Sequence, residues 1–201
     1  MTPDILFTCV TNFKNLIGTN YSLHLGRGGK HRILQISIEK EDFYHLMGLH
    51  YLKDRPDKRS RAKIIDEILT SEDYRSHIAS SRYWTAELEK RVLCTSILEK
   101  ILDDNKTIIR FNSNRLQFYS RIDSDYLLVN KDYPLTSVSL HDIYLFLGRK
   151  DNSTSMFCKS IFTKTNHDFT LNQENWTLLY KIKTTSNSKS QILYKHKNYE
   201  P

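Results

Sequence analysis

The sequence has little that would hold a fold together covalently or through a metal. Its 201 residues include three cysteines, four prolines and six glycines. The cysteines, Cys9, Cys94 and Cys158, are odd in number, far apart and without a C-x-x-C spacing, which argues against a disulfide framework and a zinc knuckle. An H-E-x-x-H motif is also missing. We therefore expect reduced thiols in the core, no metal and no cofactor.

Signals for export and for membrane insertion are absent as well. Residues 1–5 contain neither a basic segment nor an uninterrupted apolar one, and no later run of apolar residues is long enough to span a bilayer. We expect a cytoplasmic protein without a membrane partner.

Positive charge is the clearest bias in the composition. Lysine and arginine number 30 against 23 acidic residues, which gives a net charge of +7, and no single lysine-rich tail supplies it. A folded basic surface suits a phosphate backbone, although ordinary basic proteins share this composition. With 39% hydrophobic residues the chain can bury one substantial core, so we expect one domain over residues 1–201.

Hydrophobic periodicity is helical in much of the first half of the chain and strand-like in the second. Helices are expected over residues 2–17, 41–52, 62–69 and 71–103, and a β-hairpin over 21–38 that turns at the glycine-rich residues 26–29. These glycines lack the G-x-x-x-x-G-K-[ST] pattern of a phosphate-binding loop. An exposed basic connector is expected over residues 54–61 and a polar turn over 184–190. The alternating segments predict strands over residues 107–111, 115–120, 126–129, 143–147, 156–162, 176–182 and 191–195. Helices followed by antiparallel strands predict an α+β fold.

Two histidines and a lysine lie close together in residues 43–54. On the expected helix, His50 continues an apolar stripe and lies close to Lys53, while His45, five positions earlier, lies well apart around the helix. A half-buried imidazole there titrates near neutrality. The alternative is that His50 is a hydrogen-bonded residue at the edge of the core and Lys53 a solvated cation.

A second group of polar residues lies on the expected strands. Alternation over residues 156–162 places Lys159 and Ile161 on one face of the sheet and Ser160 with Phe162 on the other. The Ser160 hydroxyl would bond either a backbone group or a substrate phosphate. Adjacent expected strands carry Arg110, Arg115, Tyr119 and Arg121. These residues could offer cationic and stacking contacts to RNA, and a solvated strand face explains them equally well.

These residue types suffice for RNA cleavage without a metal. The reaction needs a base for the ribose 2′-hydroxyl, an acid for the leaving 5′-oxygen and a cation for the charged phosphorane. Histidine, lysine and serine can supply all three.

Three motifs taken together resemble a known nuclease family. They are F-Y-H-L-M-G-L-H-Y-L-K-D at residues 43–54, C-K-S-I-F at 158–162 and Q-E-N-W-T-L-L-Y-K-I-K at 173–183. The pattern resembles the fourth phage-associated family of the barnase/EndoU/colicin/RelE nuclease group, over roughly residues 13–183. The chain departs from that pattern at Ile161, where the family more often has an aromatic residue, and at Phe169, where a tyrosine is expected.

The resemblance implies a compact ribonuclease-like fold. N-terminal helices and the hairpin would pack on a curved antiparallel sheet, with a helical insertion at about residues 60–103 and RNA across the exposed face of the sheet. Such proteins resemble toxins of phage or inter-microbial conflict, which implies RNA, including tRNA, as substrate and a cognate inhibitor or antitoxin as partner.

The motifs place the site residues of the family at His45, His50, Lys53 and Ser160. We expect His50 to act as general base or acid, His45 as the second proton-transfer group or an orienting group, Lys53 as a phosphate cation and Ser160 as a hydrogen-bond donor. RNA contacts are expected from Arg27, Arg110, Arg115, Tyr119, Arg121 and Lys159. The resulting hypothesis is a metal-independent endoribonuclease that leaves a 2′,3′-cyclic phosphate. Two alternatives stay open: a non-catalytic RNA- or protein-binding module on the same fold, and a structural or regulatory protein whose charge is incidental.

Overall fold

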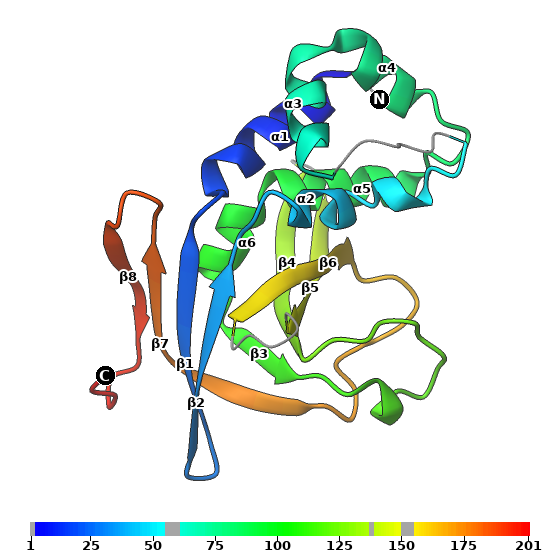
Figure 1. The fold of residues 1–201 in the computed structure, drawn as a ribbon. Coiled ribbons are helices and arrows are strands. Elements are labelled where there is room, and N and C mark those ends of the chain that lie inside the picture. The colour runs from blue at the N-terminus through cyan, green and yellow to red at the C-terminus, as the bar shows by residue number, and fades with distance from the viewer. Residues whose placement is uncertain (1–2, 55–60, 137–138, 150–154) are drawn as a thin grey trace.

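The computed structural model describes residues 3–54, 61–136, 139–149 and 155–201 (Figure 1). The helices of this part of the chain are α1 (Pro3–Leu16), α2 (Asp42–Leu46), α3 (Arg61–Thr70), α4 (Glu72–Ala79), α5 (Ala86–Ser96) and α6 (Leu98–Asp104), with 3₁₀ turns η1 (Leu49–Tyr51) and η2 (Ser113–Arg115). The strands are β1 (Asn20–Arg27), β2 (Lys30–Ser37), β3 (Thr107–Arg110), β4 (Tyr126–Thr136), β5 (Ser139–Arg149), β6 (Ser155–Thr163), β7 (Glu174–Thr184) and β8 (Ser190–Lys195).

The strands form one large, strongly curved sheet. Their order is β1-β2-β6-β5-β4-β3-β7-β8, and β1 also pairs with β7, so seven strands close into a ring of pairings and β8 lies outside it. All pairs are antiparallel except β2 with β6, which is parallel and joins only Gln35 to Ser155 and Ile36 to Met156. A largely antiparallel sheet combined with six helices in the described residues confirms the predicted α+β class.

Helices α1 to α5 lie together at one end of the sheet, toward the top of Figure 1, while α6 lies lower, at the height of the strands. The main core joins both layers, since Phe13 of α1 and Phe43 of α2 are fully buried with Leu23 of β1 and Leu145 of β5. The opposite face of β3, β4 and β5 carries a smaller core of Ile109, Phe111, Leu127, Val129, Tyr144, Phe146 and Phe169. Its aromatic rings meet edge to face, as Phe146 and Phe169 do at 5.4 Å between centroids.

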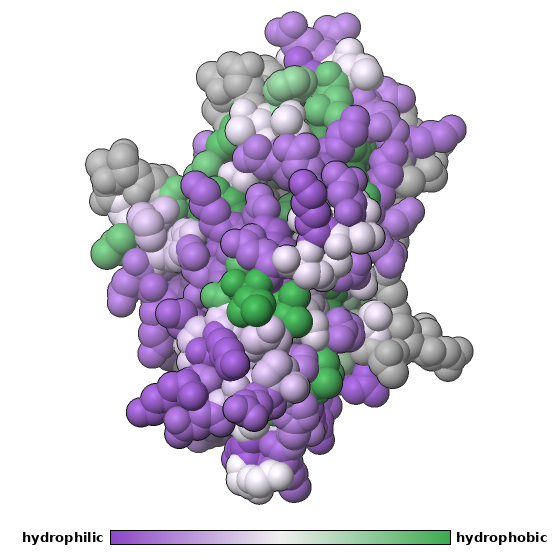
Figure 2. Space-filling model, turned by 90° about the vertical axis from the view of Figure 1, so that its left-hand side faces the viewer, coloured by the Kyte–Doolittle hydropathy of each residue, from purple (hydrophilic) through white to green (hydrophobic). Residues whose placement is uncertain are grey.

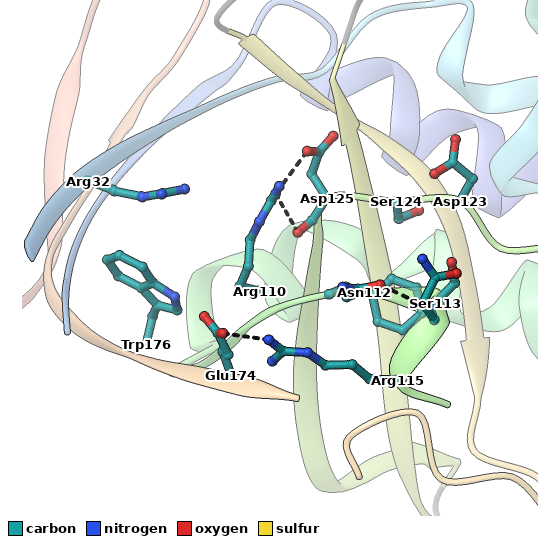
Figure 3. Close-up of a pocket in the computed structure, with 12 residues that line it drawn as sticks. Arg32, Arg110, Asn112, Ser113, Arg115, Asp123, Ser124, Asp125, Glu174 and Trp176 are labelled. Atoms are coloured by element: carbon teal, nitrogen blue, oxygen red, sulfur yellow. Dashed lines mark hydrogen bonds and ion pairs between the residues drawn. The ribbon is translucent and has the colours of Figure 1, made fainter. Parts of the chain in front are cut away.

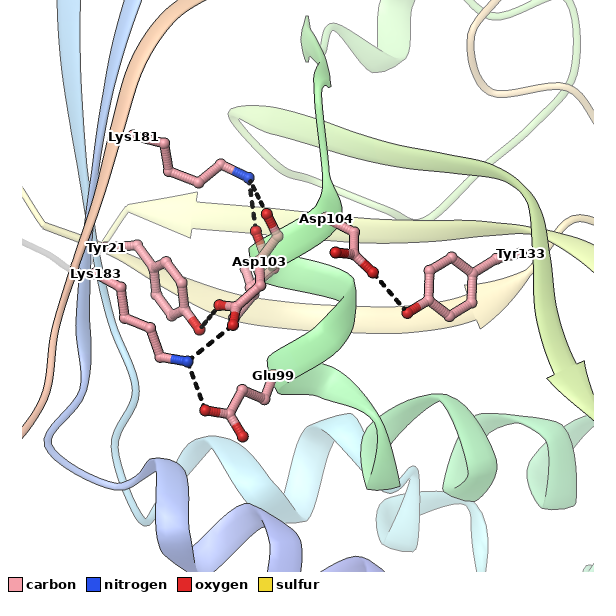
Figure 4. A network of polar contacts seen from close by, with 8 residues as sticks. Tyr21, Glu99, Asp103, Asp104, Tyr133, Lys181 and Lys183 are labelled. Atoms are coloured by element: carbon pink, nitrogen blue, oxygen red, sulfur yellow. Dashed lines mark hydrogen bonds and ion pairs between the residues drawn. The ribbon is translucent and has the colours of Figure 1, made fainter. Parts of the chain in front are cut away.

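The C-terminal end of α6 is fastened to β7 by two lysines (Figure 4). Lys181, 1% exposed, donates from Nζ to the backbone oxygens of Leu102 (2.7 Å), Asp103 (3.1 Å) and Asn105. Lys183 binds the carboxylates of Glu99 and Asp103. The last carbonyls of a helix have no partner within the helix and carry partial negative charge, so Lys181 satisfies them, and together the two lysines hold β7 in place.

The outer edge of the sheet is formed by β8. Figure 2 views the molecule from this side and shows a mostly hydrophilic surface with a small hydrophobic area. Ile192 of β8 is 60% exposed, and Lys195 closes the strand. Charged residues on an edge strand discourage pairing with other chains.

Several sequence predictions are confirmed. Helix α1 and the β1–β2 hairpin lie where they were expected, and the hairpin turns at Gly28 and Gly29, whose φ values of 53° and 76° suit a two-residue turn. The three cysteines are free and buried. Burial raises the pKa of the Cys94 thiol to about 12, so it stays protonated at neutral pH. No helix among the described residues is long and apolar enough to cross a membrane.

Other predictions are wrong. The expected long helix over residues 71–103 is three helices. Thr85 starts α5 anew by accepting a hydrogen bond from the backbone N–H of Leu88, and Ile97, with a non-helical φ of −113° and ψ of 20°, separates α5 from α6. Residues 115–120 form no strand; the chain leaves β3, makes the turn η2 and runs irregularly to β4. Most of the expected connector over 54–61 lies outside the described residues.

Candidate nucleic-acid site

The histidine segment does not form the continuous helix that its spacing predicts. Helix α2 ends at Leu46, and Gly48 then adopts a left-handed conformation with φ 72° before η1 begins. The reversal turns Leu49 and Leu52 into the core, at 6% and 4% exposure. The prediction that His50 lies along a buried stripe is therefore wrong, and His50 is exposed.

This break brings the two histidines together. The ring centroids of His45 and His50 are 5.3 Å apart, so the prediction that they lie well apart is also wrong. Tyr44 flanks both imidazoles, at 5.6 Å from His45 and 6.2 Å from His50. The Tyr51 ring lies 4.0 Å from that of His50. Two imidazoles and two phenols thus form one cluster at the surface.

Helix α5 packs directly against the turn that creates this cluster. A Cβ atom at Gly48 would lie 2.7 Å from Leu88 Cδ1 and 2.9 Å from Arg91 Cδ, and the φ of 72° is one that residues with a Cβ rarely adopt, so glycine is strongly favoured there. Arg91 donates to the backbone oxygen of His45 at 3.4 Å and lies over the Tyr51 ring, 5.4 Å from its centroid. Burial lowers the pKa of the Arg91 guanidinium, which nevertheless stays charged at neutral pH.

A pocket of about 530 Å³ opens beside the cluster. Its lining is aromatic and cationic, with one carboxylate among the described residues: Tyr51, Lys53, Tyr83, Thr85, Glu87, Leu88, Arg91, Phe162, Thr163 and Thr165. Lys53, predicted as a phosphate cation, is an exposed member of this lining. Aromatic rings next to cations suit stacked bases and phosphates.

Arg91, Tyr51 and Tyr83 were missed by sequence reasoning. The one signal for Arg91 was its position three residues after the buried Leu88, on the face that α5 turns inward.

Ser160 lies on β6 but is not among the described residues that line this pocket. Ser160 pairs with Phe146 and Phe162 with Tyr144, so both lie on the face of the smaller core, as predicted. Lys159 does not share a face with Ile161, because a bulge between the pairs Leu147–Cys158 and Phe146–Ser160 inserts it as an extra residue. Lys159 instead lies beside Gly148 and donates to the backbone oxygen of Asp123.

A second pocket, of about 490 Å³, lies where β2, β3 and β7 meet the loop before β4 (Figure 3). We call it the arginine pocket; it is lined by Arg32, Arg110, Phe111, Asn112, Ser113, Asn114, Arg115, Asp123, Ser124, Asp125, Glu174 and Trp176. It contains two of the predicted RNA contacts, Arg110 and Arg115, while a third, Arg27, binds Glu174 at its edge.

The arginines of this pocket are held by carboxylates. Arg110 binds Asp125 at 2.8 Å and Arg115 binds Glu174 at 2.9 Å. The hydrogen bond from Arg115 lowers the pKa of Glu174, and Arg27 adds to this effect. The negative charge of both carboxylates is matched by neighbouring guanidinium groups.

The remaining predicted RNA contacts lie elsewhere. Tyr119, 84% exposed, and Arg121 belong to the irregular segment before β4, so the prediction that they lie on strands next to Arg110 is wrong. Neither they nor Lys159 are among the described residues that line the arginine pocket.

Comparison with known families identifies the class of protein. Residues 5–198 match the model of the family described as phage-Barnase-EndoU-ColicinE5/D-RelE like nuclease4. The chain belongs to this nuclease family. No curated protein and no solved structure matches the chain. The matched residues include the histidine cluster and the linings of both pockets, so the family resemblance stated from the motifs is confirmed for nearly the whole chain.

Proposed function

We propose that this nuclease is a metal-independent endoribonuclease in which His45 and His50 transfer the protons. The observation that carries the proposal is the 5.3 Å separation of the two imidazoles, beside a pocket that Lys53 and Arg91 make cationic. Imidazoles titrate near neutral pH, so one can accept a proton while the other donates one.

The chemistry follows from these positions. One imidazole takes the proton of a ribose 2′-hydroxyl, whose oxygen attacks the adjacent phosphorus. The bond from phosphorus to the 5′-oxygen breaks, and the second imidazole, protonated, gives its proton to that oxygen. In this proposal Lys53 and Arg91, which line the adjacent pocket, stabilise the extra charge on the phosphorane. DNA lacks the attacking hydroxyl, so RNA is the expected substrate.

Arg91 and Ser160 have supporting roles in this proposal. Arg91 contacts the backbone of His45 and the ring of Tyr51, so it positions the cluster as well as contributing charge. Ser160 precedes Phe162 of the pocket by two residues on β6 and stays the predicted hydrogen-bond donor to substrate. A toxin role with a cognate inhibitor is part of the proposal, and growth arrest on expression, relieved by a His50→Ala change, would support it.

The test is incubation of the purified protein with total RNA and with tRNA in EDTA, followed by mapping of the ends. We expect 2′,3′-cyclic phosphate and 5′-hydroxyl ends. His45→Ala and His50→Ala should each lower the cleavage rate by about 10²- to 10⁴-fold. His77→Ala, which removes an exposed imidazole on α4, is the matched control.

Two results would overturn the proposal. Cleavage that persists in a variant carrying both His45→Ala and His50→Ala would show that the histidines do not take part in the reaction. RNA binding without product, unchanged by the same substitutions, would instead identify a binding module on this fold.

A further inference from the structure

Two buried polar groups in the arginine pocket have no hydrogen-bond partner among the described residues. They are the indole Nε1 of Trp176, a residue only 6% exposed, and the hydroxyl Oγ of Ser124. An indole N–H can only donate, and a buried donor left unpaired costs about 1–3 kcal/mol. A ligand with acceptor oxygens would remove that cost.

Arg32 is the cation next to this donor. Its guanidinium lies over the Trp176 ring, 5.1 Å from the centroid, and donates to the Tyr126 hydroxyl at 3.3 Å. Among the described residues that line the pocket, Arg110 and Arg115 have carboxylate partners and Arg32 has none. Figure 3 shows Arg32 and the indole nitrogen of Trp176 on the side of the pocket that faces Arg110, whose guanidinium is bound to Asp125.

The surrounding charge favours an anion. Three carboxylates line the pocket, and one of them, Asp123, has a side chain that is 99% exposed. Asp125 and Glu174 are neutralised by the guanidinium groups that contact them, from Arg27, Arg110, Arg115 and Arg149. The positive charge of Arg32 is therefore available to bind an anionic ligand. The volume of about 490 Å³ exceeds what one phosphate group needs and leaves room for an attached sugar and base.

We propose that the arginine pocket binds a phosphate group, through the Arg32 guanidinium and the Trp176 indole N–H, with the Ser124 hydroxyl contacting the same nucleotide. The source of that phosphate is the backbone of the RNA substrate, so this inference rests on the proposed function. The arginine pocket and the pocket beside the histidine cluster share no residue in their described linings. The bound phosphate is therefore not the one that is cut, and the pocket serves as a subsite that holds the strand.

The indole N–H offers a direct reporter, because the chain has only two tryptophans. In a ¹⁵N-labelled protein, Trp84→Phe assigns the two indole resonances. We expect the Trp176 resonance to move when inorganic phosphate is added, and also when a short 2′-O-methyl RNA that cannot be cleaved is added. The resonance of Trp84 should stay in place.

Variants distinguish a specific contact of the Arg32 guanidinium from a general effect of positive charge. Arg32→Gln should weaken binding of both ligands by about tenfold or more, the effect of losing one charge-assisted contact. Ser124→Ala should weaken binding of the RNA more than that of phosphate. Lys195→Gln, which removes the same charge from the exposed end of β8, should leave both affinities within about twofold.

The outcomes distinguish this inference from the proposed function. It is overturned if the Trp176 resonance does not respond to phosphate, or if Arg32→Gln binds as tightly as the unmodified protein. For RNA cleavage, Arg32→Gln should raise KM and leave kcat nearly unchanged, and an unchanged KM would also contradict the subsite. If phosphate and 2′-O-methyl RNA bind as expected while no RNA is cut, the proposed function fails and the subsite stands.

Discussion

The imidazole rings of His45 and His50 meet across a break in the backbone, with centroids 5.3 Å apart. Gly48 makes this arrangement, since its φ of 72° ends α2 and redirects the chain into η1. An unbroken helix would turn the two side chains to different faces. The proposed acid and base therefore depend on one glycine and on the helix α5 that packs against it.

Replacing Gly48 with alanine should destabilise the protein and separate the histidines. The added Cβ would meet Leu88 and Arg91 below 3.0 Å, in a backbone conformation that non-glycine residues adopt at a cost of about 1–2 kcal/mol. The clash adds a packing cost of about 1–3 kcal/mol. Chemical denaturation measures the loss, and RNA cleavage by the folded fraction should fall as well.

The matched control for that change is Gly28→Ala in the hairpin turn. Gly28 also has a positive φ, of 53°, but a Cβ there would meet nothing within 4 Å. The Gly28→Ala variant should lose only the stability that the unfavourable backbone conformation costs, and it should keep its RNA-cleaving activity. Equal losses of stability in the two variants would show that contact with α5 does not matter.

Replacing Lys181 with methionine should be strongly destabilising. The change keeps most of the buried volume but removes the ammonium that binds three backbone oxygens at the end of α6. Leaving buried acceptors without their donor costs about 1–3 kcal/mol. Urea unfolding measures this loss, with Lys195→Met on the exposed strand β8 as control. A loss below about 1 kcal/mol would contradict the assigned role of Lys181 in joining α6 to β7.

Acid should destabilise the protein through His24. This imidazole faces His31, Tyr180 and the hydroxyl of Tyr199, which lies 2.7 Å from His24 Nδ1. Burial, followed by the nearby His31, lowers the pKa of His24 below its ordinary value of 6.5. In acid the unfolded chain then binds a proton more readily than the folded one. The contribution of His24 to the free energy of unfolding is complete above pH 6.5 and is lost as the pH falls through the lowered pKa of the folded state.

The variant His24→Gln removes that titration. The difference in the free energy of unfolding between the unmodified protein and this variant should fall between pH 8 and pH 5, as measured by urea titrations at each pH. A difference that is independent of pH would show that His24 does not contribute to acid sensitivity.

Sequence reasoning recovered much of the fold where local patterns decide it. Helix α1, the hairpin with its Gly28–Gly29 turn and six of the seven strands expected after residue 105 lie where periodicity placed them. It was less successful where a single residue interrupts a pattern. The apolar spacing over residues 41–52 predicted one helix, but Gly48 adopts a left-handed conformation just after α2 and ends it, and α5 packs against that glycine.

The candidate site, like the fold, was predicted only in part. The motifs identified His45, His50 and Lys53 by residue type, but gave the wrong geometry for the two histidines. Only some residues of the arginine pocket were predicted from the sequence. Arg32 alternates in step with Leu34 and Ile36 of the core face, yet nothing local indicates that it meets Trp176, more than a hundred residues later.

By itself, the sequence determined the class of fold, the family and the kinds of groups available for the chemistry, because residue type and periodicity express local hydrogen bonding and burial. The tertiary structure alone decided which groups meet. The pairing of β1 with both β2 and β7 closes the ring of strands, and β7 brings Trp176 beside Arg32 of β2. Such pairings join segments far apart in the chain, and their energy comes from contacts that no local pattern contains.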